Sequence, residues 1–545
     1  MAVGGKRQRA QQQTDVAAAK KKSKKQTQQQ NADEKAIDKE LKKVNDMLQK
    51  EETSQKQTWQ IGKRLKKLME TYPTMATQKT IDAFFLWGTA LARLASLNED
   101  PTLAEAAADK FEEMSALSEG DDSAMGPVGY SLWASSLMII ATETRQKEVL
   151  DQALTKFQQA VEVDGGTTFE TNFQFAKALK DGGDLVKFLQ TGGDENEAAA
   201  IEEDGENSSF MDYYKRALAL CVKLEHIYKE ESAKASAERD ASNADASDAD
   251  DKEDGASDSD SERNYDEDDE DDDKVLLEDY AEVKLLEAIL HGAIENETRT
   301  SASFDTTLAL FEKALELSPG SPDALMELAN YVSKKYLEHR STLQGVEWPK
   351  VFADIEAQYK SVLADAGFDM AECHEICVRK DTKQQEEPEE EEIDERVPHL
   401  LNSLGKALAS FAVGKQQQEQ VASKNGKEKK KKQPAGVRSS HFTHAVEVLR
   451  SAHHFHDKLG CYPLAWLYAY PGIEDEENCR TWLETAESYG VLDDELQVAD
   501  FKTMHDKEWF QRFLTPVEEI GEDEMEGEAS GEEAEDQDDD ESADE

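Results

Sequence analysis

Residues 311–332 read FEKALELSPGSPDALMELANYV, and this stretch decides the fold class. Phe311 and Ala314 are three residues apart, so on a helix they share one face, and the small alanine lets a following helix approach closely. Pro319 ends that helix and starts a turn, because proline donates no hydrogen bond and disfavours helical backbone before it. Leu328-Ala329 then form a large/small pair where the next helix crosses its partner. The pattern predicts a helix, a tight turn and a second helix.

Weaker copies of this pattern recur along the chain. In each copy a large residue follows a small or medium one after four positions, and another small or medium residue follows three positions later. The copies are Ala107/Phe111/Met114, Ala153/Phe157/Ala160, Ile355/Tyr359/Val362 and Ala445/Leu449/Ala452. Candidate partner helices carry Trp87-Gly88 and Leu404-Gly405. The spacing is typical of tetratricopeptide repeats and predicts an all-α fold, an α-solenoid of degenerate tetratricopeptide-like helical hairpins. The alternative is an irregular helical array that matches a degenerate pattern by chance.

The net charge of −55, from 118 acidic and 63 basic residues among 545, is gathered in blocks. Basic residues dominate positions 1–25, whereas residues 238–273 hold nineteen acids against three bases and residues 517–545 hold acids and no base. Tracts so rich in like charge and so poor in apolar residues cannot bury enough surface to offset chain entropy, so we expect them to be disordered.

These blocks divide the chain into expected regions. The regions are a disordered basic tail (1–31), N-terminal helical repeats (32–230), an acidic disordered insert (231–274), C-terminal helical repeats (275–515, with an acidic run at 386–395 and a Lys-rich loop at 415–438) and an acidic disordered tail (516–545).

Composition also excludes several classes of protein. A chain this acidic is repelled by phosphate, so we expect no direct nucleic-acid binding by the folded body. The longest mostly apolar run, 131–141, is about half of the roughly 20 residues that a membrane span needs, so we expect no membrane association. The first residues lack the apolar core of a secretory signal, and five cysteines fit a reducing compartment better than a disulfide framework.

No pattern in the sequence points to catalysis, and we expect neither an active site nor a cofactor. The pairs Gly165-Gly166, Gly182-Gly183 and Gly192-Gly193 lack the Lys-Ser/Thr of a phosphate loop and are interpreted as loops between helices. Cys373, His374 and Cys377 resemble half of a zinc site, which the histidines at 441, 444, 453, 454 and 456 could complete. Because no second cysteine pair has structural-zinc spacing, we expect no metal site there, only core cysteines beside surface histidines.

The basic N-terminal tail has the layout of a two-part nuclear import signal. Its candidate residues form two clusters separated by ten residues, Lys6, Arg7 and Arg9, then Lys20, Lys21, Lys22, Lys24 and Lys25. Such clusters suit an importin surface, so we expect a nuclear protein, the alternative being a solvating or RNA-contacting tail. Lys429 to Lys432 form a second candidate signal.

Three interpretations of the acidic tracts stay open, namely solubilisation, mimicry of nucleic acid toward a basic partner, and covering of the protein's own lysines. Serines followed by an acid three residues later suit an acid-directed kinase, and the candidates are Ser257, Ser259, Ser530 and Ser542, with Ser247 of the same pattern. Phosphorylation would add about 1.5 to 2 negative charges per site.

The overall layout resembles the fungal enhancer of translation termination family over about residues 32–515. The resemblance lies in the Lys/Gln-rich N-terminus, the degenerate repeats with segments such as FFLWG (84–88) and YSLWA (130–134), and the acid-rich C-terminus. It implies a nuclear, non-catalytic protein required for correct translation termination and linked to oxygen-responsive gene expression. It also implies a partner, an iron- and 2-oxoglutarate-dependent prolyl hydroxylase that acts on a small-subunit ribosomal protein.

Two other functions compete with this one. An acidic tetratricopeptide-type histone chaperone would combine repeats, acidic tracts and an import signal in the same way. A tetratricopeptide co-chaperone would carry a clamp of Lys, Asn and Arg on successive helices; Asn330 and Lys334 share one expected helix, but no matching set precedes them, so the sequence does not show this clamp.

Overall fold

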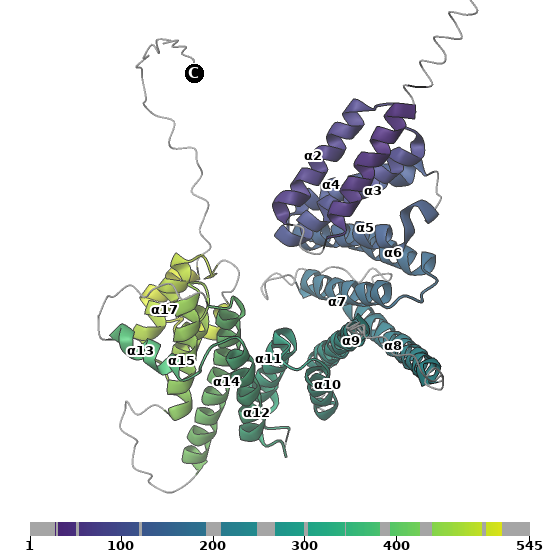
Figure 1. Cartoon of the computed structure of the whole chain (residues 1–545). Helices are drawn as coiled ribbons and strands as arrows, with labels where there is room; N and C mark the ends of the chain where they lie inside the picture. The colour runs from purple at the N-terminus through teal and green to yellow at the C-terminus, as the bar shows by residue number, and fades with distance from the viewer. Residues whose placement is uncertain are drawn as a thin grey trace, which may run out of the picture. The chain divides into compact units, whose positions relative to one another are not determined.

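The computed structural model describes residues 28, 31–50, 54–118, 122–191, 209–247, 268–298, 303–343, 345–381, 393–425, 439–492 and 497–514 (Figure 1). Within these residues the chain forms α-helices, two short 3₁₀ helices and turns, and no β-strand. The chain divides into two compact units, Met1–Leu328 and Ala329–Glu545, and the division falls inside helix α11 (Pro322–His339). The fold is an all-α array of helical hairpins, as the sequence predicts.

The first unit is a succession of antiparallel helices. Its helices are residues 31–48, α2 (Gln55–Thr71), α3 (Thr77–Asn98), α4 (Pro101–Leu117), α5 (Asp122–Thr144), α6 (Lys147–Val163), α7 (Phe169–Thr191), α8 (Phe210–Ser247), α9 (Asp268–Thr298) and α10 (Phe304–Leu317). From α2 to α10 each helix packs against the next, and α3, α5, α7 and α9 also contact one another in that order. Packing only on near neighbours is the signature of a solenoid.

The α3–α4 hairpin shows why the repeat pattern folds in this way. Asp100 caps α4 by accepting hydrogen bonds from the backbone N–H groups of Thr102 and Leu103, and Pro101 occupies the first helical turn. Where the two helices cross, a Cβ on Gly88 would lie 2.9 Å from Cζ of Phe111, so the ring would have to shift for any residue larger than glycine. The small residue on the first helix and the large residue on the second therefore act together.

A second glycine contact corrects the interpretation of Gly182-Gly183 as a loop. Both residues lie inside α7, where a Cβ on Gly183 would come within 2.6 Å of the Tyr214 ring and one on Gly182 within 3.0 Å of Leu150. The pair lets α7 pack closely between α6 and α8. Gly165-Gly166, in contrast, do form a turn after α6, both with φ of +70°; Gly192-Gly193 lie outside the described residues.

The first unit also differs from the expected regions around the acidic insert. Helix α8 continues to Ser247 and α9 begins at Asp268, so residues 231–247 and 268–274 are helical. The alanines at 233, 235, 237, 241, 244 and 246 favour helix strongly enough to offset the acidic residues among them. The two helices contact each other, Tyr228 stacks on Tyr280 with ring centroids 4.0 Å apart, and both rings join one core with α7. The chain therefore divides at 328/329 and not at the insert.

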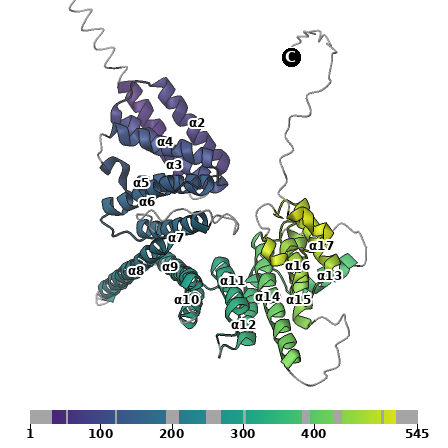
Figure 2. The same ribbon diagram turned by 180° about the vertical axis from the view of Figure 1, so that it is seen from behind.

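The second unit begins with the end of α11 and continues with the helices from α12 to η2 (Figure 2). Its helices are α12 (Trp348–Asp365), α13 (Glu372–Asp381), α14 (Arg396–Asn425), α15 (Ser440–Phe455), α16 (Cys461–Ala469), α17 (Glu476–Ser488), η1 (Val498–Phe501) and η2 (Glu508–Phe513). Tyr336 of α11 packs against Trp348 and Phe352 of α12 and Phe411 of α14, with ring centroids 5.2–5.6 Å apart. Because α14 runs to Asn425, the first part of the expected Lys-rich loop (415–438) is helical.

The residues expected to pack the repeats lie as follows. Those with at most 3% of their surface exposed are Phe111, Phe157, Phe311, Ala314, Leu328 and Ala329. Trp87 is half-buried, and Pro319 is exposed in the turn between the end of α10 and the start of α11. Pro319 thus acts through the turn, not through the core.

Among the described residues, one helical segment is long and apolar enough to cross a membrane. It is Ala124–Thr144 of α5. Within the structure, 61% of that window is buried. Length and composition alone are weak support for a span.

Candidate binding groove

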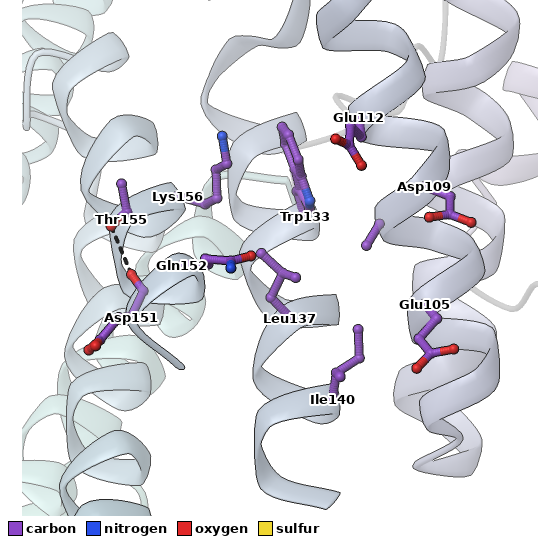
Figure 3. A pocket seen from close by; sticks show the side chains of 11 residues that line it. Glu105, Asp109, Glu112, Trp133, Leu137, Ile140, Asp151, Gln152, Thr155 and Lys156 are labelled. Carbon is purple, nitrogen blue, oxygen red and sulfur yellow. Dashed lines mark hydrogen bonds between the residues drawn. The ribbon is translucent and has the colours of Figure 1, made fainter. Parts of the chain in front are cut away.

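A groove of about 670 Å³ lies in the first unit between α4, α5 and α6 (Figure 3). Its floor is a row of apolar side chains on α5, Trp133, Leu137 and Ile140, which the spacing of four and three residues places on one helical face. Each is less than a tenth exposed, so the flanking helices cover most of their surface and leave a narrow apolar strip. The volume falls within the range of pockets that take ligands or peptide side chains.

One wall of the groove is acidic. Glu105, Asp109 and Glu112 of α4 repeat the spacing of the floor, and Figure 3 shows the three stacked along that helix. All three side chains are exposed. The anionic row and the apolar row therefore run beside each other over two helical turns, or about 10 Å.

The other wall comes from α6 and carries the one basic side chain that lines the groove. Lys156 places its ammonium 3.9 Å from the centroid of the Trp133 ring, a favourable cation–π geometry. Asp151, Gln152 and Thr155 complete this wall, and the Thr155 hydroxyl donates to the Asp151 backbone carbonyl at 2.8 Å. The net charge of the lining is negative, with four carboxylates against one ammonium.

A second acidic surface runs along α7, α9 and the start of α11. Burial raises the pKa of Glu282 in α9, and the nearby Asp279, Glu170 and Asp323 raise it further against the opposing effect of Lys177. The largest cause of the raised pKa is thus partial burial, and repulsion by the neighbouring carboxylates adds a smaller part.

A second carboxyl group with a raised pKa, that of Glu327, lies at the start of α11. Burial raises the pKa of Glu327, and Asp323 and Asp184 add to the rise, whereas Lys180 lowers it. Lys180 is itself engaged with Asp181 and Asp184 at 3.3 and 3.1 Å, so its charge is largely neutralised within α7. The surface thus has more carboxylates than nearby cations to balance them.

The cysteines and histidines considered for zinc do not form a cluster of ligands in the described residues. Cys373 and Cys377 are buried where α13 meets α15, and His374 lies 2.8 Å from Glu447 of α15. Burial raises the pKa of the Cys373 thiol to about 11, which disfavours the thiolate that a metal requires. In the described part of the chain no group of three or more His, Cys, Asp or Glu side chains is arranged to hold a metal ion.

Several residues predicted to be functional lie outside the described residues. These are the import-signal candidates Lys6, Arg7, Arg9, Lys20, Lys21, Lys22, Lys24 and Lys25 and the phosphorylation candidates Ser257, Ser259, Ser530 and Ser542. The groove, on the other hand, was missed by sequence reasoning. Its sequence signal is the matched spacing of 105/109/112 and 133/137/140, which predicts two helical rows but not that they lie side by side.

Comparison with known proteins gives structural likeness only. No protein-family model matches the chain, and no curated protein is similar to it. Among solved structures, a human IFIT1 dimer with m7Gppp-AAAA is 12% identical over 81% of this chain and 87% of its own, with a TM-score of 0.22. Naa15/Naa10 bound to HypK-THB is 11% identical over 89% of this chain and 69% of its own, with a TM-score of 0.20. At these TM-scores neither likeness supports an argument about function, and the helical-repeat fold rests on the packing described above.

Proposed function

We propose that this protein is a non-catalytic scaffold that binds protein partners through its helical hairpins. The observation that carries the proposal is the groove between α4, α5 and α6, where an apolar strip and a row of carboxylates lie on helices that pack against one another. A helical-repeat fold fits such a role, because successive hairpins build extended surfaces from residues that are free of any catalytic constraint. The arrangement favours recognition of a peptide or a helix over chemistry on a small substrate.

The resemblance to the enhancer of translation termination family suggests the cellular setting. On that basis the scaffold is nuclear, affects correct translation termination and hypoxia-linked gene expression, and binds an iron- and 2-oxoglutarate-dependent prolyl hydroxylase. The basic tail would supply the import signal through an importin. Replacing Lys20, Lys21, Lys22, Lys24 and Lys25 by glutamine in the full chain should move a fluorescent fusion from the nucleus to the cytoplasm, whereas an unchanged distribution would contradict the import signal.

Affinity capture from cells at low and at high salt tests the scaffold itself. A hydroxylase that stays bound at high salt supports the first function, because contacts made by apolar packing are screened little by salt. If no protein is retained above background at either salt concentration, the scaffold function is wrong.

A histone chaperone is the second candidate, and the carboxylates of α7, α9 and α11 favour it. Asp279, Glu170 and Asp323 lie near Glu282, and Asp323 and Asp184 lie near Glu327, so a basic partner would meet several carboxylates on these helices. The helix ends in the structure define which residues to delete in a test of this function. Because α8 ends at Ser247 and α9 begins at Asp268, residues 248–267 and 517–545 can be removed without cutting a described helix. A chaperone should then lose histone binding, whereas a hydroxylase regulator should keep its partner.

A further inference from the structure

We propose that the groove between α4, α5 and α6 binds a basic α-helix of a partner protein, one with Lys or Arg at positions i, i+4 and i+7. The inference rests on the scaffold function proposed above and adds the chemistry of the partner and the residues that recognise it. Its basis is the match between two rows of the groove, the carboxylates of Glu105, Asp109 and Glu112 and the apolar strip of Trp133, Leu137 and Ile140.

The shape of the groove selects the kind of side chain that enters it. The apolar strip is too narrow for the whole face of an amphipathic helix, because each of its residues is less than a tenth exposed. Lys and Arg side chains suit it better, since their aliphatic stems can lie on apolar surface while the charged head stays at the wall. A stem on Leu137 or Ile140 would bring its head to the carboxylates of α4, which Figure 3 shows on the adjacent helix.

The spacing selects the secondary structure of the partner. The three carboxylates are separated by four and three residues on α4, so they span about 10 Å along its axis. Basic residues at i, i+4 and i+7 of a second helix lying along α4 have the same separation, and each meets one carboxylate. Arg would gain most, because its planar guanidinium can bind a carboxylate through two hydrogen bonds.

Lys156 shows that the groove already accommodates a cation. Its ammonium lies 3.9 Å from the Trp133 ring centroid and 5.6 Å from that of Tyr130. A partner cation that reaches Trp133 must displace this lysine, so Lys156 opposes binding both by its charge and by its position.

The test measures binding of a fluorescent, alanine-based helical peptide with arginines at i, i+4 and i+7 to the full chain at moderate salt. Because the protein carries a net charge of −55, any basic peptide binds it to some extent, and the controls must remove this contribution. The groove variant is Glu105→Gln/Asp109→Asn/Glu112→Gln. The matched control is Glu34→Gln/Glu70→Gln/Glu312→Gln, which removes three exposed charges from helices of the same unit that do not line the groove.

We expect the groove variant to lower the affinity about tenfold and the control to change it less than twofold, since each exposed ion pair contributes only modestly. Lys156→Gln should raise the affinity several-fold, an effect of opposite sign that simple loss of structure would not produce. Equal losses in the groove variant and the control, or a loss with Lys156→Gln, would overturn the proposal.

Two further outcomes identify what occupies the groove and whether the groove is the binding site. If replacing the five lysines at 20–25 by glutamine raises the affinity tenfold or more, the occupant is this chain's own tail and the assignment to a partner is wrong. If the arginine peptide binds no better than its glutamate counterpart while the protein still captures partners from cells, the groove assignment falls and the scaffold function stands.

Discussion

The α3–α4 hairpin of the first unit and the α14–α15 hairpin of the second share one kind of helix contact, but they differ in how well that contact should accept a substitution. In each, a glycine on the first helix faces a large residue on the second, Gly88 against Phe111 and Gly405 against Leu449. A Cβ on Gly88 would meet the far edge of an aromatic ring, which can shift. A Cβ on Gly405 would lie 2.6 Å from Cγ of Leu449 and 3.4 Å from its backbone nitrogen, so the helices themselves are in contact there. The comparison teaches that the atom facing the glycine decides whether the crossing can accept a larger residue at that position.

Replacing Gly405 by alanine should have the largest effect. The methyl group would enter space held by a branch point and a backbone atom, and overpacking of this kind costs about 1–3 kcal/mol, here near the upper end. We expect the second unit to lose about 2–3 kcal/mol of its free energy of unfolding, as measured by denaturant unfolding of the full chain. Leu449→Ala removes a buried side chain and is costly alone, but the double variant should lose less than the sum of the two single losses; an additive loss would contradict the close contact.

Gly88→Ala should cost less. The clash with the Phe111 ring is opposed by the better helix propensity of alanine, which is worth about 1 kcal/mol in a helix interior. We expect a net loss of about 1 kcal/mol or less in the same unfolding measurement. A loss equal to that of Gly405→Ala would show that the two crossings are equally tight.

Acid should have opposite effects at two carboxyl sites, one in each unit. In the second unit, a hydrogen bond from His444 and pairing with Lys360 lower the pKa of Glu356 to about 2. A carboxyl with a lowered pKa stabilises the fold above its ordinary pKa near 4.5, and this contribution disappears as the pH falls toward 2. Calorimetry should therefore show an acid-induced fall in melting temperature that Glu356→Gln makes less steep. An identical slope in the variant would mean that the pair adds no stability.

In the first unit the pKa values of Glu282 and Glu327 are raised. These two carboxyl groups should give the smallest effect, and its sign should be opposite to that of Glu356. Ionised Glu282 and Glu327 cost stability near neutral pH, and the cost disappears as they take up protons on acidification. Glu282→Gln/Glu327→Gln should raise the stability by about 0.5 kcal/mol at pH 7, because it removes two partly buried charges and their repulsion by neighbouring carboxylates, and should change nothing below their ordinary pKa. A gain that persists in acid would point to a cause other than charge.

The sequence predicted the hairpins best where small and large residues recur at fixed spacing, as at Ala107/Phe111/Met114. It failed at Gly182-Gly183, because a glycine pair inside a helix looks like a loop until the ring of Tyr214 is seen to pack against it. It failed again at 231–247, because charge density suggested disorder while the alanines favoured helix. The groove escaped prediction for a different reason. Its two rows lie on separate helices, and only packing brings them side by side.

The α8–α9 hairpin, finally, indicates where this protein can be enlarged. Both helices continue well past the stacked Tyr228 and Tyr280, so the connection between Ser247 and Asp268 starts and ends far along the chain from the core that they share with α7. A change in the length of that connection leaves the order and spacing of the repeats unaltered. A reporter domain or a cleavage site placed there would follow the protein in cells without altering any described repeat contact.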